Sequence, residues 1–260
     1  MARVSRIVQP IGLALILAPA ARAADPAKAP AVELPRNLAA PRLRIDTALV
    51  DSALTRLSRG RGEAARLLGK LGFKPAAIAE LENADELSGE RMRMNLDADD
   101  AEESIVELRA SATEKNQPNS EERRVSRYFY AWLDPRGDSA EVVGTLLLES
   151  SSPLESEAGC SVNLTPVHAE EISDTLIECS ELKPGAPPTK SWHASLVTLE
   201  RGRAELIFES RESVALPRWD KQERAFVVAG KAPREIRLVV GKGKAVKRRH
   251  LFDAKAFRYR

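Results

Sequence analysis

Several kinds of reactive side chain are scarce in this sequence. Two cysteines are too few for a small disulfide-framework protein, and three histidines leave little material for a metal enzyme. Aromatic residues make up only 5% of the chain. No stretch after residue 23 reaches the ~20 consecutive apolar residues that a membrane-spanning helix needs. Because hydrophobic residues still reach 43%, the composition predicts a globular protein and excludes a polytopic membrane protein.

Familiar catalytic motifs are absent as well. The sequence has no G-x-S-x-G, no H-E-x-x-H and no glycine-rich phosphate loop. A zinc site would need ligands that converge from distant strands, because the histidines His168, His193 and His250 stand far apart. We therefore predict no catalytic residue, no metal and no cofactor from the sequence.

Residues 1–23 have the pattern of an export signal. Arg3 and Arg6 precede an apolar run of about a dozen residues, and Ala21-Arg22-Ala23 gives the A-x-A form that signal peptidase recognises. The run is too short to span a bilayer. The sequence predicts cleavage after Ala23, a periplasmic or secreted protein, and no transmembrane segment in the mature chain.

Removing this signal changes the charge of the protein. The whole chain carries +2, but the signal contains three arginines and no acid, so the mature chain carries −1. Export also bears on Cys160 and Cys179, because an oxidising compartment favours their pairing. We expect a disulfide between them that stabilises the fold by about 3 kcal/mol.

The mature chain divides by its patterns into three parts. Residues 24–42 are rich in proline and alanine and predict an extended linker. Residues 43–88 carry apolar residues at three- and four-residue steps, with breaks at Gly60 and Gly72, and predict a small helical unit. Its second and third helices have the outline of a helix-turn-helix, but the third opens with alanines where base-reading side chains belong, so no nucleic-acid partner is predicted.

In residues 89–260 apolar and polar residues alternate with a period of two. The clearest hairpin joins 125–133 to 140–148 through Asp134-Pro-Arg-Gly-Asp138, and further hairpins flank 200–203 and 241–243. About eight to ten short strands with such turns predict an antiparallel β-sandwich or barrel-like region, mainly β, preceded by the helical unit.

Clustered acids lie between two of the expected strands, at Asp97, Asp99, Asp100, Glu102 and Glu103. Calcium binds six to eight oxygens, so such a cluster is one way to build a site. The D-x-[DN]-x-[DN]-G pattern with a closing glutamate is absent, however. We favour a hydrated turn at this position over a calcium site.

Charge is distributed unevenly along the chain. Eight acids and no Lys or Arg occupy 149–181, whereas the last nineteen residues carry eight bases against one acid. The two segments either pair with each other within the fold or are each exposed to a partner. A third interpretation is a solvent-exposed terminal strand whose lysines only prevent its edge from pairing with another strand. The candidate anion-binding residues are Lys242, Lys244, Lys247, Arg248, Arg249, Lys255, Arg258 and Arg260.

These observations favour an exported, non-catalytic binding or assembly component of the bacterial cell envelope. Its partner would be an envelope protein or an anionic glycan or lipid surface, bound through the basic C-terminal strand. The alternative is a secreted hydrolase that acts on polysaccharide or peptide, with a site assembled from separate strands. A histidine beside a carboxylate, or two carboxylates in one pocket, would favour the hydrolase.

Overall fold

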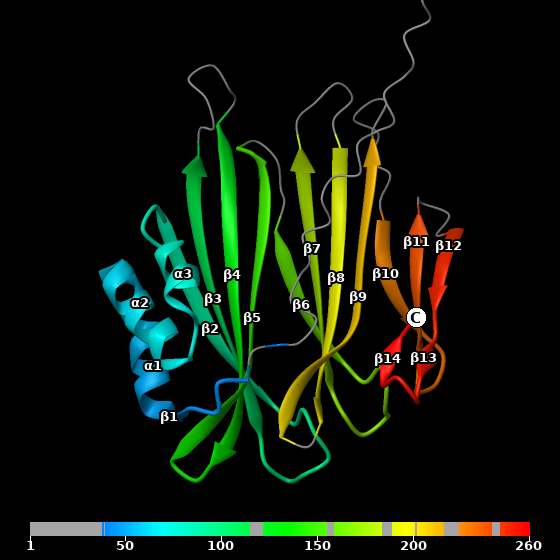
Figure 1. The fold of residues 1–260 in the computed structure, drawn as a ribbon, viewed down its shortest axis with the longest axis horizontal. Helices are drawn as coiled ribbons and strands as arrows, with labels where there is room; N and C mark the ends of the chain where they lie inside the picture. The colour runs from blue at the N-terminus through cyan, green and yellow to red at the C-terminus, as the bar shows by residue number, and fades with distance from the viewer. Residues whose placement is uncertain are drawn as a thin grey trace, which may run out of the picture. The chain divides into compact units, whose positions relative to one another are not determined.

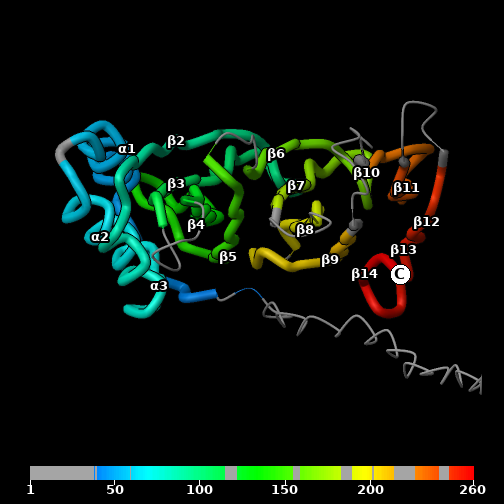
Figure 2. Tube along the Cα trace, turned by 90° about the horizontal axis from the view of Figure 1, so that it is seen from above, coloured from blue at the N-terminus to red at the C-terminus, as the bar shows by residue number. Residues whose placement is uncertain are grey.

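The computed structural model describes residues 38, 40–114, 122–154, 159–183, 189–200, 202–215, 224–240 and 245–260. The predicted signal, most of the predicted linker, and Lys242 and Lys244 lie outside these residues. Residues 35–260 form one compact unit. Its fold is mostly β, with antiparallel sheets that include a curled half-barrel, so the predicted fold class is confirmed (Figures 1 and 2).

The helical unit forms where the apolar steps place it. It consists of α1 (Thr47–Thr55), the short 3-10 helix η1 (Leu57–Arg59), α2 (Arg61–Lys70) and α3 (Pro75–Ala79). Asp46 caps α1 by accepting hydrogen bonds from the backbone N–H groups of Ala48 and Leu49. Ile45, which the helical pattern includes, lies instead in a short strand, β1 (Arg44–Asp46), that pairs with β5.

Five antiparallel strands form the first sheet, sheet A, in the order β1-β5-β4-β3-β2 (Figure 1). The other four are β2 (Glu86–Met94), β3 (Glu103–Glu114), β4 (Arg123–Arg136) and β5 (Ser139–Pro153). The predicted turn Asp134–Asp138 joins β4 to β5, but both strands are longer than the apolar runs indicate. The helices cover one face of this sheet, where Leu67 and Leu68 of α2 share a core with Leu108 and Phe129.

The opposite face of sheet A is also buried. Tyr128, Tyr130 and Trp132 of β4 are almost fully enclosed, and the Trp132 indole donates a hydrogen bond to Thr175 Oγ1 on β7 at 3.2 Å. This explains why the β4 sequence lacks the alternation expected of a strand with one wet face.

Sheet B follows in the order β6-β7-β8-β9. Its strands are β6 (Cys160–Thr165), β7 (Asp174–Lys183), β8 (Thr189–Glu200) and β9 (Arg203–Ala215). Cys160 and Cys179 are directly opposite in the β6–β7 register and form the predicted disulfide. Figure 2 shows the strands of sheets A and B end-on, and in this view both sheets are curled.

The third sheet, sheet C, has the order β10-β11-β12 and packs against sheet B. Its strands are β10 (Arg224–Ala229), β11 (Glu235–Val240) and β12 (Ala245–His250), and the chain ends in the small hairpin β13 (Phe252–Asp253) and β14 (Arg258–Tyr259). Phe208 of β9, Phe226 of β10 and Tyr259 of β14 form edge-to-face contacts in the shared core. This packing holds the basic C-terminal segment against the body of the protein.

No helix among the described residues is both long and apolar enough to cross a membrane.

Candidate functional site

The basic residues of the C-terminus lie on an edge of the fold. Among the strands that the structure describes, β12 pairs only with β11, so it forms an edge of sheet C and carries exposed cations. Lys247, Arg248 and Arg249 occupy this strand and are exposed, and Lys255, Arg258 and Arg260 are exposed in the segment that follows. Of the eight candidate anion-binding residues, these six are therefore exposed on β12 and in the segment after it.

Some of these cations pair with nearby carboxylates. Arg248 Nη1 lies 2.8 Å from Glu212 Oε1, and Lys247 Nζ lies 3.9 Å from Oε2 of the same residue. Arg249 Nε lies 3.4 Å from Glu235 Oε1, and Arg260 Nη1 lies 3.4 Å from Asp253 Oδ2. Four of the six described cations thus share three carboxylates in these pairs, and the segment keeps an excess of positive charge.

Acidic residues of the stretch 149–181 form ion pairs with arginines in other parts of the fold. Glu149 pairs with Arg127 at 3.1 Å, Glu170 with Arg234 at 3.3 Å, and Glu181 with Arg211 at 3.2 Å. Glu155 and Glu157 lie outside the described residues. These pairs connect the acidic stretch to strands other than β12, so they leave the positive charge of the basic segment available.

Apolar side chains are exposed beside the basic ones. Val246 on β12 is 41% exposed and Leu251, directly after the strand, is 63% exposed. On the other side of the strand, the His250 ring packs on Phe208 with ring centroids 4.9 Å apart. Burial, with Arg248 nearby, lowers the pKa of His250 and so disfavours the charged form of this residue.

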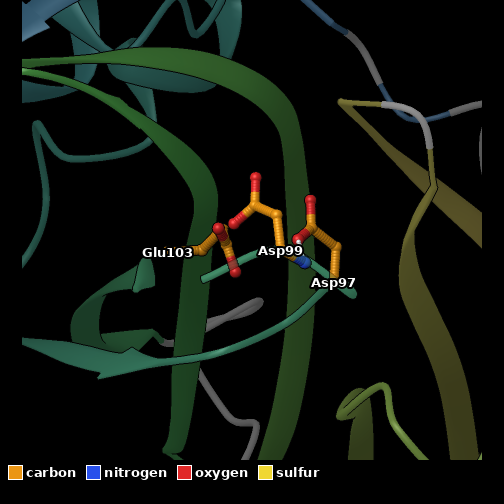
Figure 3. A group of neighbouring side chains, drawn as sticks. All are labelled: Asp97, Asp99 and Glu103. Atoms are coloured by element: carbon orange, nitrogen blue, oxygen red, sulfur yellow. Dashed lines mark hydrogen bonds between the residues drawn. The ribbon is translucent and has the colours of Figure 1, made fainter. Parts of the chain in front are cut away.

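The acidic loop between β2 and β3 is more ordered than a hydrated turn. Asp97, Asp99 and Glu103 each turn a carboxylate toward the same point, and one oxygen of each lies within 4.8 Å of the others (Figure 3). Glu103 is the first residue of β3 and is fully buried. The expectation of a hydrated turn is therefore wrong for Glu103, which the strand carries into the interior. Asp100 and Glu102 are exposed, as a hydrated turn predicts.

The three histidines have separate surroundings. His168 Nδ1 lies 2.7 Å from Asp174 Oδ1, a buried carboxylate whose other oxygen accepts hydrogen bonds from the N–H groups of Val167 and His168. This arrangement fixes the loop before β7. In the described part of the chain, the one group of three metal-ligating side chains that gathers so closely is the acidic one, and it contains no histidine.

His193 is the histidine that lies beside both a hydroxyl and an acid. Its Nε2 lies 3.3 Å from Ser195 Oγ and 3.3 Å from Glu209 Oε1. A serine–histidine–acid relay needs the acid on Nδ1 and the serine on Nε2, whereas here both meet the same nitrogen. Ser195 is also buried, at 1% exposure.

A further polar group, on β2 to β4, escapes sequence reasoning. Glu90 and Glu107 are directly opposite in the β2–β3 register, and Arg109 lies over the Tyr128 ring at 5.5 Å. Burial, with Glu90 across the strand pair, raises the pKa of Glu107. Burial likewise raises the pKa of Tyr130. The period of two in the sequence places Glu107 and Arg109 on one face of the strand. That face is expected to be exposed to solvent, so the sequence does not predict that these side chains are buried together.

Comparison with protein families, with curated proteins and with solved structures finds no match.

Proposed function

We propose that the protein is an exported, non-catalytic binding or assembly component of the bacterial cell envelope, which engages an anionic partner through its basic C-terminal strand. The observation that carries this proposal is the exposed row of cations on the edge strand β12 and in the segment after it. The disulfide Cys160–Cys179 fits an oxidising compartment and so supports export.

The excess of cations over carboxylates favours an anionic partner. Arg249 is 64% exposed although it lies near Glu235, and Lys255 and Arg258 point their charge into solvent without a carboxylate partner among the described residues. The Lys255 and Arg258 side chains therefore remain available to another anion. The exposed Val246 and Leu251 add apolar contact area at the same place.

Charge reversal at two unpaired cations tests this proposal. Each basic residue near an anionic surface contributes about 1 kcal/mol of attraction, so Lys255→Glu with Arg258→Glu should weaken binding by roughly 30-fold or more. The probes are vesicles with anionic phospholipid, vesicles with zwitterionic lipid only, an acidic polysaccharide, and an envelope protein extract. Binding to an anionic probe should also weaken as salt rises from about 0.1 M to 1 M.

The matched control reverses two exposed lysines on the helical unit, Lys70→Glu with Lys74→Glu. This variant has the same net charge as the test variant but leaves the basic segment unchanged. Retention that is equal in the two variants, or no retention of any anionic probe at low salt, would rule out the basic strand as the binding surface.

The alternative function, a secreted hydrolase acting on polysaccharide or peptide, gains one observation from His193. Its ring lies beside the Glu209 carboxylate and the Ser195 hydroxyl, which is the kind of neighbourhood that general acid–base catalysis uses. The burial of Ser195 and the shared nitrogen make binding the better-supported function.

Hydrolysis of peptide and polysaccharide libraries by the purified mature chain tests the alternative. Activity that is lost in His193→Ala and kept in His250→Ala would place a hydrolytic site at His193. Activity that survives in both variants would assign it to another part of the chain or to a contaminant.

A further inference from the structure

The β2–β3 connection holds three carboxylates in one fixed arrangement. Glu103 Oε2 accepts a hydrogen bond from the Leu96 N–H at 2.7 Å, Asp97 Oδ1 from the Asp99 N–H at 2.9 Å, and Asp99 Oδ1 from the Ala101 N–H at 2.7 Å. Each carboxylate therefore has one oxygen fixed by the loop backbone. The second oxygen of each remains for another ligand.

Glu103 is the member that a hydrated acidic turn does not explain. It is 0% exposed, and its Oε1 is buried without a hydrogen-bond partner in the structure. A buried carboxylate oxygen without a partner is costly, because the charge has lost its hydration and gained nothing in return. Figure 3 shows this side chain directed toward Asp97 and Asp99, so the buried carboxylate lies where negative charge is already concentrated.

No cation of the described chain accounts for this cluster. At this end of β4, the Arg136 guanidinium binds the Asp134 carboxylate through two contacts. Asp134 is itself buried, and the negative charges of Asp97 and Asp99 reach it, which adds to the burial that raises its pKa. Arg136 thus offsets Asp134 and leaves the three loop carboxylates uncompensated.

We propose that Asp97, Asp99 and Glu103 bind a divalent cation, with calcium as the best fit. All three ligands are carboxylate oxygens, which hard cations prefer over softer transition metals. Calcium tolerates the irregular geometry of a loop and completes its six to eight ligands with water or backbone carbonyl oxygens, whereas magnesium demands an octahedron. This site is independent of the basic strand and goes beyond the function proposed above.

The site also explains why the loop departs from an EF-hand pattern. Glu103 closes the group from the start of a strand, not from a helix, so the glycine and the twelve-residue spacing of that motif are not needed. A bound cation would fasten the β2–β3 connection to the end of β4, because Ser104 pairs with Leu133 directly beside Asp134. Affinity in the range of extracellular calcium modules, about 10⁻⁴–10⁻³ M, is expected.

Calcium titration of the chelator-treated mature chain, by calorimetry and by thermal unfolding, tests the proposal. Saturating CaCl2 should raise the unfolding temperature by about 5 °C. Asp97→Asn with Asp99→Asn should weaken calcium binding at least tenfold and remove the shift. The matched control, Asp100→Asn with Glu102→Gln, removes two exposed charges of the same loop and should keep both.

Glu103→Gln separates metal binding from folding. Without calcium this variant should be at least as stable as the natural chain, because it removes a buried charge and keeps an acceptor for the Leu96 N–H. With calcium it should show no shift in unfolding temperature. Lack of calcium binding by the natural chain at 10-fold the expected dissociation constant, about 10 mM, or equal loss of binding in the control variant, would overturn the proposal.

Discussion

Glu178 shows how a single half-buried carboxylate makes this fold sensitive to pH. It lies on β7 under sheet C, where its Oε1 accepts a hydrogen bond from the Phe226 N–H at 3.1 Å. Burial raises the pKa of Glu178 although this hydrogen bond opposes the change. Folding therefore favours the protonated form of the residue.

Glu178→Gln is expected to stabilise the protein at neutral pH. Since the folded pKa lies above the unfolded value near 4.5, the folded state binds the proton more tightly. The contribution of Glu178 to stability is complete below the unfolded pKa and is lost as pH rises through the folded pKa. The glutamine variant should thus gain about 1 kcal/mol over the natural chain at pH 8, and this gain should vanish near pH 4.

Urea unfolding at pH 4, 6 and 8 measures this difference. The control is Glu205→Gln, an exposed glutamate of β9 in the same sheet, which should change stability little at any of the three pH values. A Glu178→Gln gain that stays constant from pH 4 to pH 8 would show that side-chain packing, and not the titration of Glu178, causes it.

At this scale the sequence predicts which residue types are present but not which of them become buried. The eight cations are visible as a charge run, and six of them are exposed as a run of that kind indicates. Glu103 and Glu178 look like their exposed neighbours in the sequence, because nothing local tells which acid starts a buried strand or lies under a third sheet. Burial of this kind is set by tertiary packing.

At the scale of elements, the close approach of β5 and β9 depends on a glycine. A Cβ at Gly144 would collide with the Cβ of Ala204, and Gly144 is opposite Trp132 beside the bulge of β5. Both positions are thus restricted to small residues where sheets A and B meet.

Gly144→Ala should destabilise the protein by about 1–3 kcal/mol, because the added methyl group overpacks the contact. Ala204→Gly in the same chain removes the opposing methyl group and should recover part of the loss. Guanidinium unfolding of the two single variants and the double variant gives the coupling between the sites. If the two changes add without coupling, the contact between β5 and β9 is looser than the structure indicates.

The elements themselves differ in how well the sequence predicts them. The helices and the β4–β5, β8–β9 and β11–β12 hairpins follow from apolar periods and turn residues such as Gly137 and Gly202. β6, β7 and β10 do not. β6 is only six residues long, acidic residues interrupt β7, and β10 is a short apolar run without alternation. β1 is hidden in the helical pattern since three residues are too few to show a period of two.

At the scale of the whole molecule, export and disulfide formation are linked in our proposal. Expression of the full chain in a bacterial host should yield a periplasmic protein that begins at Ala24. Its mass should be lower than that of the dithiol form by two hydrogen atoms, because the disulfide has formed. The same chain without residues 1–23 should stay in the cytoplasm with Cys160 and Cys179 reduced.

The reduced cytoplasmic form should be less stable than the exported form. The Cys160–Cys179 bond closes a loop with a sequence separation of 19 residues, and such a loop contributes about 3 kcal/mol through the entropy of the unfolded chain. That loss corresponds to a fall of roughly 6–12 °C in unfolding temperature. Cys160→Ser with Cys179→Ser, exported with its signal, should unfold at the same lowered temperature, which separates the effect of the bond from that of the compartment. An exported protein that keeps residues 1–23 would contradict the cleavage prediction, and equal unfolding temperatures with and without the bond would contradict its role in stability.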